Sequence, residues 1–256
     1  MTFAVAVNNR ALLEANLLAS PALREKPGYQ LLVQEGYPSA AAAYNHAIEH
    51  SANDVMVFLH QDIYLPEGWM ERLSAWIARL DQQDPAWGVA GCWGTTQDDI
   101  GRGHVYSPGV GVLGARFDEP QPVQALDEIV LIMRNSRRLR FDQGLSHFHL
   151  YGADLCLTAQ ARGLRAYAIS AFCIHNGNYQ LVLPPQFYQD YRYLKRKWRA
   201  HLPIQTPCIR ISRFDRDLRE RRVREFFRKL RGQVIGQFRA ENPALLYQKL
   251  QSSSGV

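Results

Sequence analysis

Short apolar runs alternate with helical patterns along the first 200 residues of the chain. Residues 3–7, 29–33 and 55–59 are β-rich, and the run 55–59 is apolar at every position. Such a run is typical of a strand buried on both faces of a parallel sheet. Helical patterns follow at 10–20 and 40–50, the second with Ser39 as its N-cap. This alternation predicts βαβ units and an α/β fold.

The pattern continues to a boundary near residues 203–207. It predicts helices over 68–80, 154–161 and 188–201, strands over 87–92, 123–133 and 165–170, and loops with a hairpin over 94–121. Pro203 and Pro207 then separate this body from a segment of different composition. We therefore predict one α/β domain at residues 1–205 and a basic helical extension at residues 206–256.

The composition is that of an ordinary globular protein, with 46% hydrophobic and 21% charged residues among 256. No run approaches the ~20 apolar residues of a membrane span, and the start lacks the features of a signal peptide. We therefore expect a cytoplasmic location. The four cysteines form no CxxC pair, which indicates reduced thiols and argues against a zinc site.

The net charge of +6 is concentrated in the extension. Residues 210–231 hold ten basic and four acidic residues, and apolar positions recur among them at helical spacing. An anionic partner is expected. The helix either packs its apolar face on the body or on a partner chain, or lies on an anionic membrane at its inner face. Nucleic acid is favoured least, because Gly-aromatic spacing is missing. A homo-oligomer also stays open.

One carboxylate occupies the position where an open α/β sheet binds its ligand. Asp62 follows the most apolar strand, and such sheets bind ligands at the carboxyl ends of their strands. A carboxylate there can hold a divalent cation, which can neutralise a diphosphate. The alternative is that Asp62 only stabilises a loop.

Around Asp62 the sequence resembles a known family. The run AAAAYNHAIEHSANDVMVFLHQDIYLPEGW is similar to the donor-binding core of family-2-like glycosyltransferases, which have the GT-A fold, and its His-Gln-Asp element resembles the StrF-type subgroup. GVAG, LDEIVLIMR, FHLYGADLCLTAQARG and IHNG follow in the same order. The resemblance covers about residues 3–205. It implies a mixed, mostly parallel sheet flanked by helices.

The resemblance implies a set of donor-binding and metal-binding residues. Residues 4–8 at the first strand end, Val5, Val7 and Asn8 among them, would contact the nucleotide of a UDP-, GDP- or dTDP-sugar, together with Asn45, His60, Gln61 and Asp62. Asp62, His60 and His175 would bind the metal. His60 replaces the first Asp of the family's DxD element, and imidazole suits Mn²⁺ better than Mg²⁺.

The resemblance also implies an inverting reaction, which needs a carboxylate base. The family usually supplies a Glu-Asp pair where this chain has Tyr151 and Gly152. Asp154, at the start of a predicted helix, is the remaining candidate. Asp127 is the next, because an acid in the middle of an apolar strand is costly without a reason.

The sequence thus predicts a glycosyltransferase that moves a sugar to a glycan or lipid-linked acceptor, in the biosynthesis of a polysaccharide. Two alternatives stay open. The altered DxD element and Glu-Asp pair are compatible with a catalytically silent binding protein. A sugar nucleotidyltransferase is favoured less, because the loop NNRALLEAN lacks the glycines of a triphosphate-binding loop.

Overall fold

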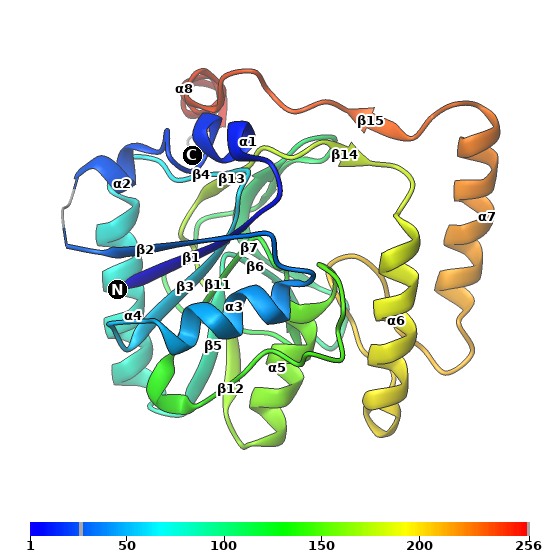
Figure 1. Ribbon diagram of the computed structural model, residues 1–256, viewed down its shortest axis with the longest axis horizontal. Coiled ribbons are helices and arrows are strands. Elements are labelled where there is room, and N and C mark those ends of the chain that lie inside the picture. The colour runs from blue at the N-terminus through cyan, green and yellow to red at the C-terminus, as the bar shows by residue number, and fades with distance from the viewer. Residues whose placement is uncertain (26–27, 255–256) are drawn as a thin grey trace.

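A seven-stranded mixed sheet forms the centre of the computed structural model, which describes residues 1–25 and 28–254 (Figure 1). The strand order is β2-β1-β3-β11-β5-β12-β9, and every strand but β11 and β9 runs in the same direction. The predicted mixed, mostly parallel sheet is therefore confirmed. The strands are β1 (Thr2–Val7), β2 (Gln30–Glu35), β3 (Val55–His60), β5 (Trp87–Gly91), β9 (Gln121–Pro122), β11 (Val130–Arg134) and β12 (Arg165–Ala168).

Helices cover both faces of this sheet. Along β3, Val57 and Leu59 join the core formed with α4, whereas Met56 and Phe58 join the core formed with α3 and α5. The alternation follows from the two-residue period of a strand. It confirms that the run 55–59 is buried on both faces. The helices are α1 (Arg10–Ala15), α2 (Pro21–Glu25), α3 (Ala40–Glu49), α4 (Trp69–Gln83) and α5 (Tyr151–Ala161).

A second sheet corrects the predicted long strand over 123–133. This stretch contains two strands that belong to different sheets. β10 pairs with β6 in the second sheet, whereas β11 lies between β3 and β5 in the first. The chain turns between them, so Asp127 lies in a turn rather than in mid-strand. The second sheet contains β4 (Ile63–Tyr64), β6 (Trp93–Thr95), β7 (Gly101–Ser107), β8 (Gly111–Gly114), β10 (Ala125–Leu126) and β13 (Cys173–His175).

The helix boundaries agree with the sequence in part. Ser39 caps α3 as predicted, accepting a hydrogen bond from the backbone N–H of Ala42 at 3.2 Å. The helix predicted over 10–20 ends at Ala15 instead, and the side-chain amide of Asn16 bonds the Leu12 carbonyl at 2.9 Å. α5 begins at residue 151 rather than 154, after Leu150 in a left-handed conformation. Asp154 is therefore the fourth residue of α5, still in its first turn.

The predicted extension at residues 206–256 contacts the preceding residues at several places. Ile204 and Ile211 form a β-bridge, β14 pairs with β15, and Tyr247 of α8 lies 6.1 Å from the Phe172 ring. None of the helices in the described ranges is long and apolar enough to cross a bilayer. The remaining elements are η1 (Asn135–Arg137), β14 (Tyr179–Gln180), α6 (Pro185–Lys197), η2 (Arg199–His201), α7 (Arg216–Leu230), β15 (Ile235–Gln237) and α8 (Pro243–Ser254).

Candidate active site

The end of β3 delivers two of the predicted site residues to the edge of the sheet. His60 is the last residue of β3, and Asp62 follows in the turn to β4. β4 pairs with β13, so that His175 lies opposite Ile63. The backbone N–H of Asn176 donates to the Asp62 carbonyl at 2.8 Å and fixes this approach. Two segments more than 100 residues apart in sequence thus meet at Asp62.

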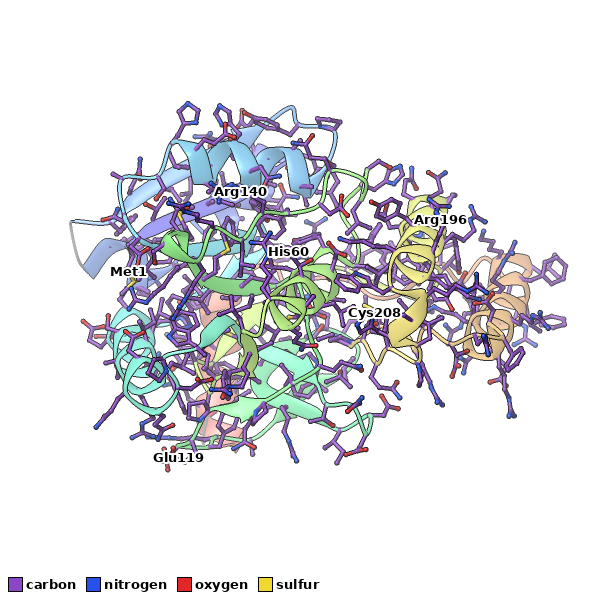
Figure 2. All side chains as sticks on the ribbon, turned by 90° about the horizontal axis from the view of Figure 1, so that it is seen from below. Met1, His60, Glu119, Arg140, Arg196 and Cys208 are labelled. Atoms are coloured by element: carbon purple, nitrogen blue, oxygen red, sulfur yellow. The ribbon has the colours of Figure 1, made fainter. Side chains whose placement is uncertain are left out.

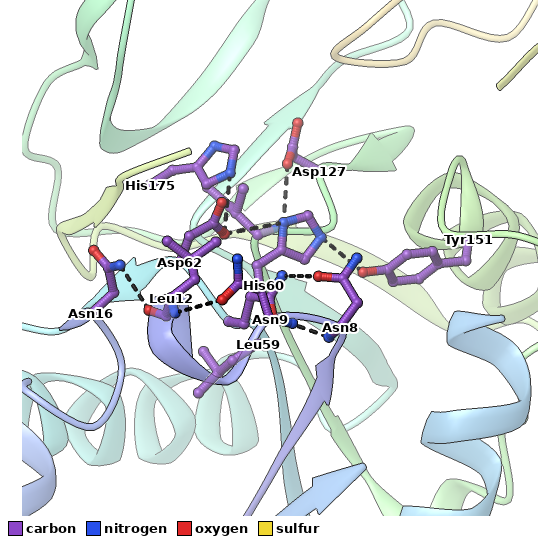
Figure 3. A network of polar contacts seen from close by, with 12 residues as sticks. Asn8, Asn9, Leu12, Asn16, Leu59, His60, Asp62, Asp127, Tyr151 and His175 are labelled. Atoms are coloured by element: carbon purple, nitrogen blue, oxygen red, sulfur yellow. Dashed lines mark hydrogen bonds and ion pairs between the residues drawn. The ribbon is translucent and has the colours of Figure 1, made fainter. Parts of the chain in front are cut away.

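His60, Asp62 and His175 form a compact cluster with metal-ligating character (Figure 3). One ligand atom from each lies within 4.8 Å of the other two. His175 Nε2 is 3.5 Å from Asp62 Oδ1, and His60 Nδ1 is 4.0 Å from the same oxygen. Two imidazoles and one carboxylate are a donor set that suits Mn²⁺ and similar transition metals better than Mg²⁺. The structure brings together the three residues predicted to bind the metal.

Asp62 and the two histidines shift one another's pKa values. Burial alone would raise the pKa of Asp62, but the neighbouring His175 and His60 rings lower it below its ordinary value. Burial lowers the pKa of His60, against the opposing effect of the Asp62 charge. For His175 the Asp62 carboxylate outweighs burial and raises the pKa. Asp62 therefore stays ionised, as a cation ligand must.

The glycine of the IHNG motif leaves the cluster open. A Cβ at Gly177 would lie 2.7 Å from Asp62 Oδ2 and 3.0 Å from His175 Nε2. Such distances are shorter than a van der Waals contact, so any other residue would displace the Asp62 carboxylate or the His175 ring. Both His175 and Gly177 of the IHNG motif therefore shape the cluster.

Two residues from other elements hold the His60 ring. His60 Nε2 lies 3.0 Å from the Tyr151 hydroxyl at the start of α5. Asp127 points toward the same ring from the turn between β10 and β11 (Figure 3), and its charge opposes the burial effect on the pKa of His60. Asp127 Oδ1 also accepts a hydrogen bond from the Ile129 N–H at 3.1 Å. Asp127 therefore lies beside the cluster, and its catalytic role stays a prediction.

Glu128 is a carboxylate that the sequence analysis missed. Its Oε1 lies 3.3 Å from the backbone N of Gly152, at the N-terminus of α5. A Cβ at Gly152 would lie only 3.3 Å from the Glu128 Cγ and 2.7 Å from the Leu126 carbonyl oxygen. Glu128 thus lies beside Gly152, where the family resemblance implied a Glu-Asp pair. Two features of the sequence could have pointed to Glu128. It follows Asp127 directly, and Gly152 has no side chain to fill the space beside it.

Burial sets the protonation of Glu128. It raises the pKa to about 8, and the adjacent Asp127 charge adds to this effect, against hydrogen bonds from the backbone of Gly152 and Leu150. A carboxylate with a pKa near the working pH can accept a proton during a reaction. Glu128 therefore has the proton-accepting property that was expected of Asp154 as the general base.

Asp154 has a different environment from the one predicted. Only 1% of it is exposed, its two oxygens accept hydrogen bonds from Lys197 Nζ at 2.7 and 2.8 Å, and Oδ1 also accepts one from Trp198 Nε1 at 2.7 Å. Burial raises its pKa, against the opposing effect of Lys197. These contacts fasten α5 to the end of α6 and leave little room for an acceptor. The structure thus favours a positioning role over that of a base.

Some of the predicted donor-binding residues line a cavity, whereas others are buried in the core. A cavity of about 370 Å³ at the ends of β1 and β2 is lined by Val7 and Asn8, together with Glu35, Tyr37 and Phe148, among others. Gln61 Oε1 accepts hydrogen bonds from the backbone N–H groups of residues 8 and 9 at 3.1 and 3.0 Å. Gln61, the residue before Asp62, thus contacts the cavity wall at Asn8, and Ala6 of the same wall pairs with His60 in the sheet. Glu35 and Tyr37 were not predicted.

Two of the predicted donor residues are buried and do not line this cavity. Val5 is completely buried in the core between β1 and α4, because odd-numbered residues of β1 face that helix. Asn45 bonds the backbone of Phe141 with both ends of its amide, at 2.8 and 3.0 Å. Its side chain thus fixes the 135–150 segment against α3, and the donor contact that the resemblance implied for Asn45 stays a prediction.

Comparison with known proteins identifies the family. Residues 2–192 match the family described as "Glycosyltransferase like family", so the chain belongs to it. A protein of Fuscovulum blasticum called "ATP synthase subunits region ORF 6" is 32% identical over 154 residues, which are 58% of this chain and 61% of that protein. The chain thus spans about three-fifths of the length of this curated relative, whose name gives no activity.

Solved glycosyltransferase structures are also similar. The mannosyltransferase PcManGT from Pyrobaculum calidifontis, in complex with GDP-Man and Mn²⁺, has a TM-score of 0.47 and 14% identity, covering 80% of this chain and 65% of its own. TarS from S. aureus with UDP-GlcNAc has a TM-score of 0.47 and 12% identity, covering 77% and 65%. GalNAc-T7 with UDP, GalNAc and Mn²⁺ has a TM-score of 0.49 and 8% identity, covering 68% and 43%.

Proposed function

We propose that this chain is an inverting, metal-dependent glycosyltransferase that uses a nucleotide-sugar donor. The observation that carries the proposal is the cluster of His60, Asp62 and His175 near the end of β3. Beside it lies the cavity whose wall contains Tyr37 and Glu35. Membership of the glycosyltransferase-like family agrees with it. The StrF-type subgroup is our finer assignment, supported by the His-Gln-Asp element and the IHNG motif.

In this proposal the donor nucleotide occupies the cavity at the ends of β1 and β2. Tyr37 offers a ring for stacking, Glu35 an acceptor for ribose or base donors, and Asn8 leads from the cavity to Gln61. The diphosphate then extends toward Asp62. His60, Asp62 and His175 would hold a divalent cation such as Mn²⁺. When bound, the cation would stabilise the negative charge on the departing diphosphate.

Glu128 acts as the base in this proposal. The acceptor hydroxyl oxygen attacks the anomeric carbon while the bond from that carbon to the diphosphate oxygen breaks. The hydroxyl proton passes to Glu128, whose raised pKa of about 8 makes it a stronger proton acceptor than an ordinary carboxylate. Asp127 keeps His60 in place and, through its charge, helps to raise the pKa of Glu128. The acceptor is a glycan or a lipid-linked glycan of a polysaccharide pathway.

Binding of the donor can be tested by thermal shift with UDP-, GDP- and dTDP-sugars, with and without Mn²⁺. A ligand that binds the native state raises Tm by mass action. We expect a shift with one nucleotide, dependent on Mn²⁺ and abolished in Asp62→Asn, whereas the exposed Asp98→Asn serves as the matched control. No shift with any donor, or an equal shift in Asp62→Asn, would contradict the proposal.

Transfer itself needs a second measurement. The donor identified by thermal shift is incubated with candidate acceptors, and release of the nucleoside diphosphate and the anomeric configuration of the product are followed by NMR. Inversion with loss of turnover in Glu128→Gln supports the assigned base. Tight binding of the donor without transfer to any acceptor would instead favour the silent binding protein. The cytoplasmic location and self-association expected from the sequence stay predictions.

A further inference from the structure

The outer face of α7 is apolar and faces solvent. Val223, Phe226, Phe227 and Leu230 are spaced i, i+3, i+4 and i+7, so they share one face of the helix. Between 52% and 69% of each residue is exposed. Phe214, just before the helix, is 77% exposed. The interpretation in which this apolar face packs on the body of the same chain is therefore wrong.

The buried Glu225, together with Leu218, fastens the opposite face to the rest of the molecule. Glu225 is 4% exposed and accepts a hydrogen bond from the Leu183 N–H at 3.1 Å and another from the Tyr188 hydroxyl of α6. Arg221 Nε donates to the same carboxylate at 3.1 Å. Leu218 packs on the cluster formed by α5 and α6. The usual arrangement of an amphipathic surface helix is thus reversed, since its apolar side points away from the molecule.

Basic side chains predominate around this apolar face, and Glu220, on the same side as Arg224, pairs with Arg216 at 3.0 Å. At 100° per residue, Arg219 lies within the face, and Arg222 and Arg224 lie on its two sides; all three are exposed. Lys229 adds a further exposed charge on the side of Arg222. In Figures 1 and 2 α7 forms one end of the molecule, beside α6 and away from the central sheet, so a flat surface can reach it.

We propose that α7 docks the protein on an anionic lipid membrane, with Val223, Phe226, Phe227 and Leu230 entering the interface. Apolar side chains partition into the boundary between headgroups and acyl chains, while flanking arginines bind anionic headgroups. A second copy of the chain fits this face poorly, because two such faces would bring Arg219 and its basic neighbours against like charges. The proposal does not depend on the catalytic assignment.

Co-sedimentation of the full chain with vesicles tests the proposal. Vesicles of phosphatidylcholine with about one-third phosphatidylglycerol are compared with phosphatidylcholine alone, at low and high salt. We expect binding to the anionic vesicles alone, weakened by salt. Phe226→Ser with Phe227→Ser should abolish it, and Arg219→Gln with Arg224→Gln should weaken it by roughly fivefold per charge. No donor sugar is present, so the result is independent of transferase activity.

Matched variants separate the helix from general effects of composition. Ile100→Ser with Val110→Ser removes two apolar residues that are also about half exposed but lie far from α7 in the sequence, and should bind vesicles as the wild type does. Thermal melts followed by circular dichroism check that each variant has the Tm of the wild type. Failure to bind anionic vesicles, unchanged binding of the Phe226/Phe227 variant, or a dimer that dissociates in that variant would each overturn the proposal. So would binding to nucleic acid with none to vesicles.

Discussion

Replacing Glu128 by glutamine should stabilise the protein while abolishing transfer. Glutamine keeps the oxygen that accepts the Gly152 N–H, at 3.3 Å in the wild type, but cannot ionise. The wild-type carboxyl has a pKa raised from 4.5 to about 8, chiefly by burial. Ionising Glu128 is therefore harder in the native state than in the unfolded chain. At neutral pH and above, this difference lowers the free energy of unfolding.

The size of the effect follows from this difference. Each pKa unit corresponds to about 1.4 kcal/mol, so a rise from 4.5 to about 8 implies a penalty of at most about 5 kcal/mol for the ionised form. Glu128 is half-buried, and water near the carboxylate reduces this figure. We expect Glu128→Gln to gain about 1–2 kcal/mol at pH 8.5.

The sign of the pH dependence is also fixed. Between pH 4.5 and 8 the native state holds a proton on Glu128 that the unfolded chain has lost, so the stability owed to this group is full below pH 4.5 and falls as pH rises through 8. The gain from Glu128→Gln should thus be near zero at pH 4.5 and largest above pH 8.

Urea unfolding of both proteins at pH 5, 6.5 and 8.5 measures this gain. Glu67→Gln, a change at an exposed residue, is the control and should show no such trend. Transferase assays on the same samples should show the loss of turnover. A constant or shrinking difference between pH 5 and 8.5 would refute the burial argument, and full activity of the variant would refute the role of Glu128 as base.

Three further changes test the site and its support. Lys197→Met leaves the buried Asp154 carboxylate without its ion pair, so we expect about 2–4 kcal/mol lower stability in urea unfolding; wild-type stability would contradict this. Gly177→Ala places a methyl group 2.7 Å from Asp62 Oδ2, so calorimetry should show at least about tenfold weaker Mn²⁺ binding at nearly unchanged Tm. Asp62→Asn removes the charge that raises the pKa of His175, and NMR titration should show that pKa fall; an unchanged value would exclude the contact.

The sequence determined most of the main sheet, and the family resemblance pointed to His60, Asp62 and His175, which the structure brings together. Apolar runs of strand length that alternate with capped helices give an α/β sheet, because runs of five or six apolar residues are too short for a buried helix and suit a strand covered on both faces. The location of Asp62 followed from the same pattern, since ligands bind where strands end. The spacing of α7 also predicted an amphipathic helix, but the direction of its apolar face depends on Glu225, whose partners Leu183 and Tyr188 are about 40 residues away.

Only the tertiary structure decided which acids face the site. Asp127, Glu128 and Asp154 are all acids near α5, and local patterns cannot rank them. The ranking comes from long-range packing: the turn between β10 and β11 brings the first two to His60 and Gly152, while α6 buries the third against Lys197. A carboxylate's role depends on its burial and its partners, and these are set by residues remote in the chain, which the sequence around each acid does not contain.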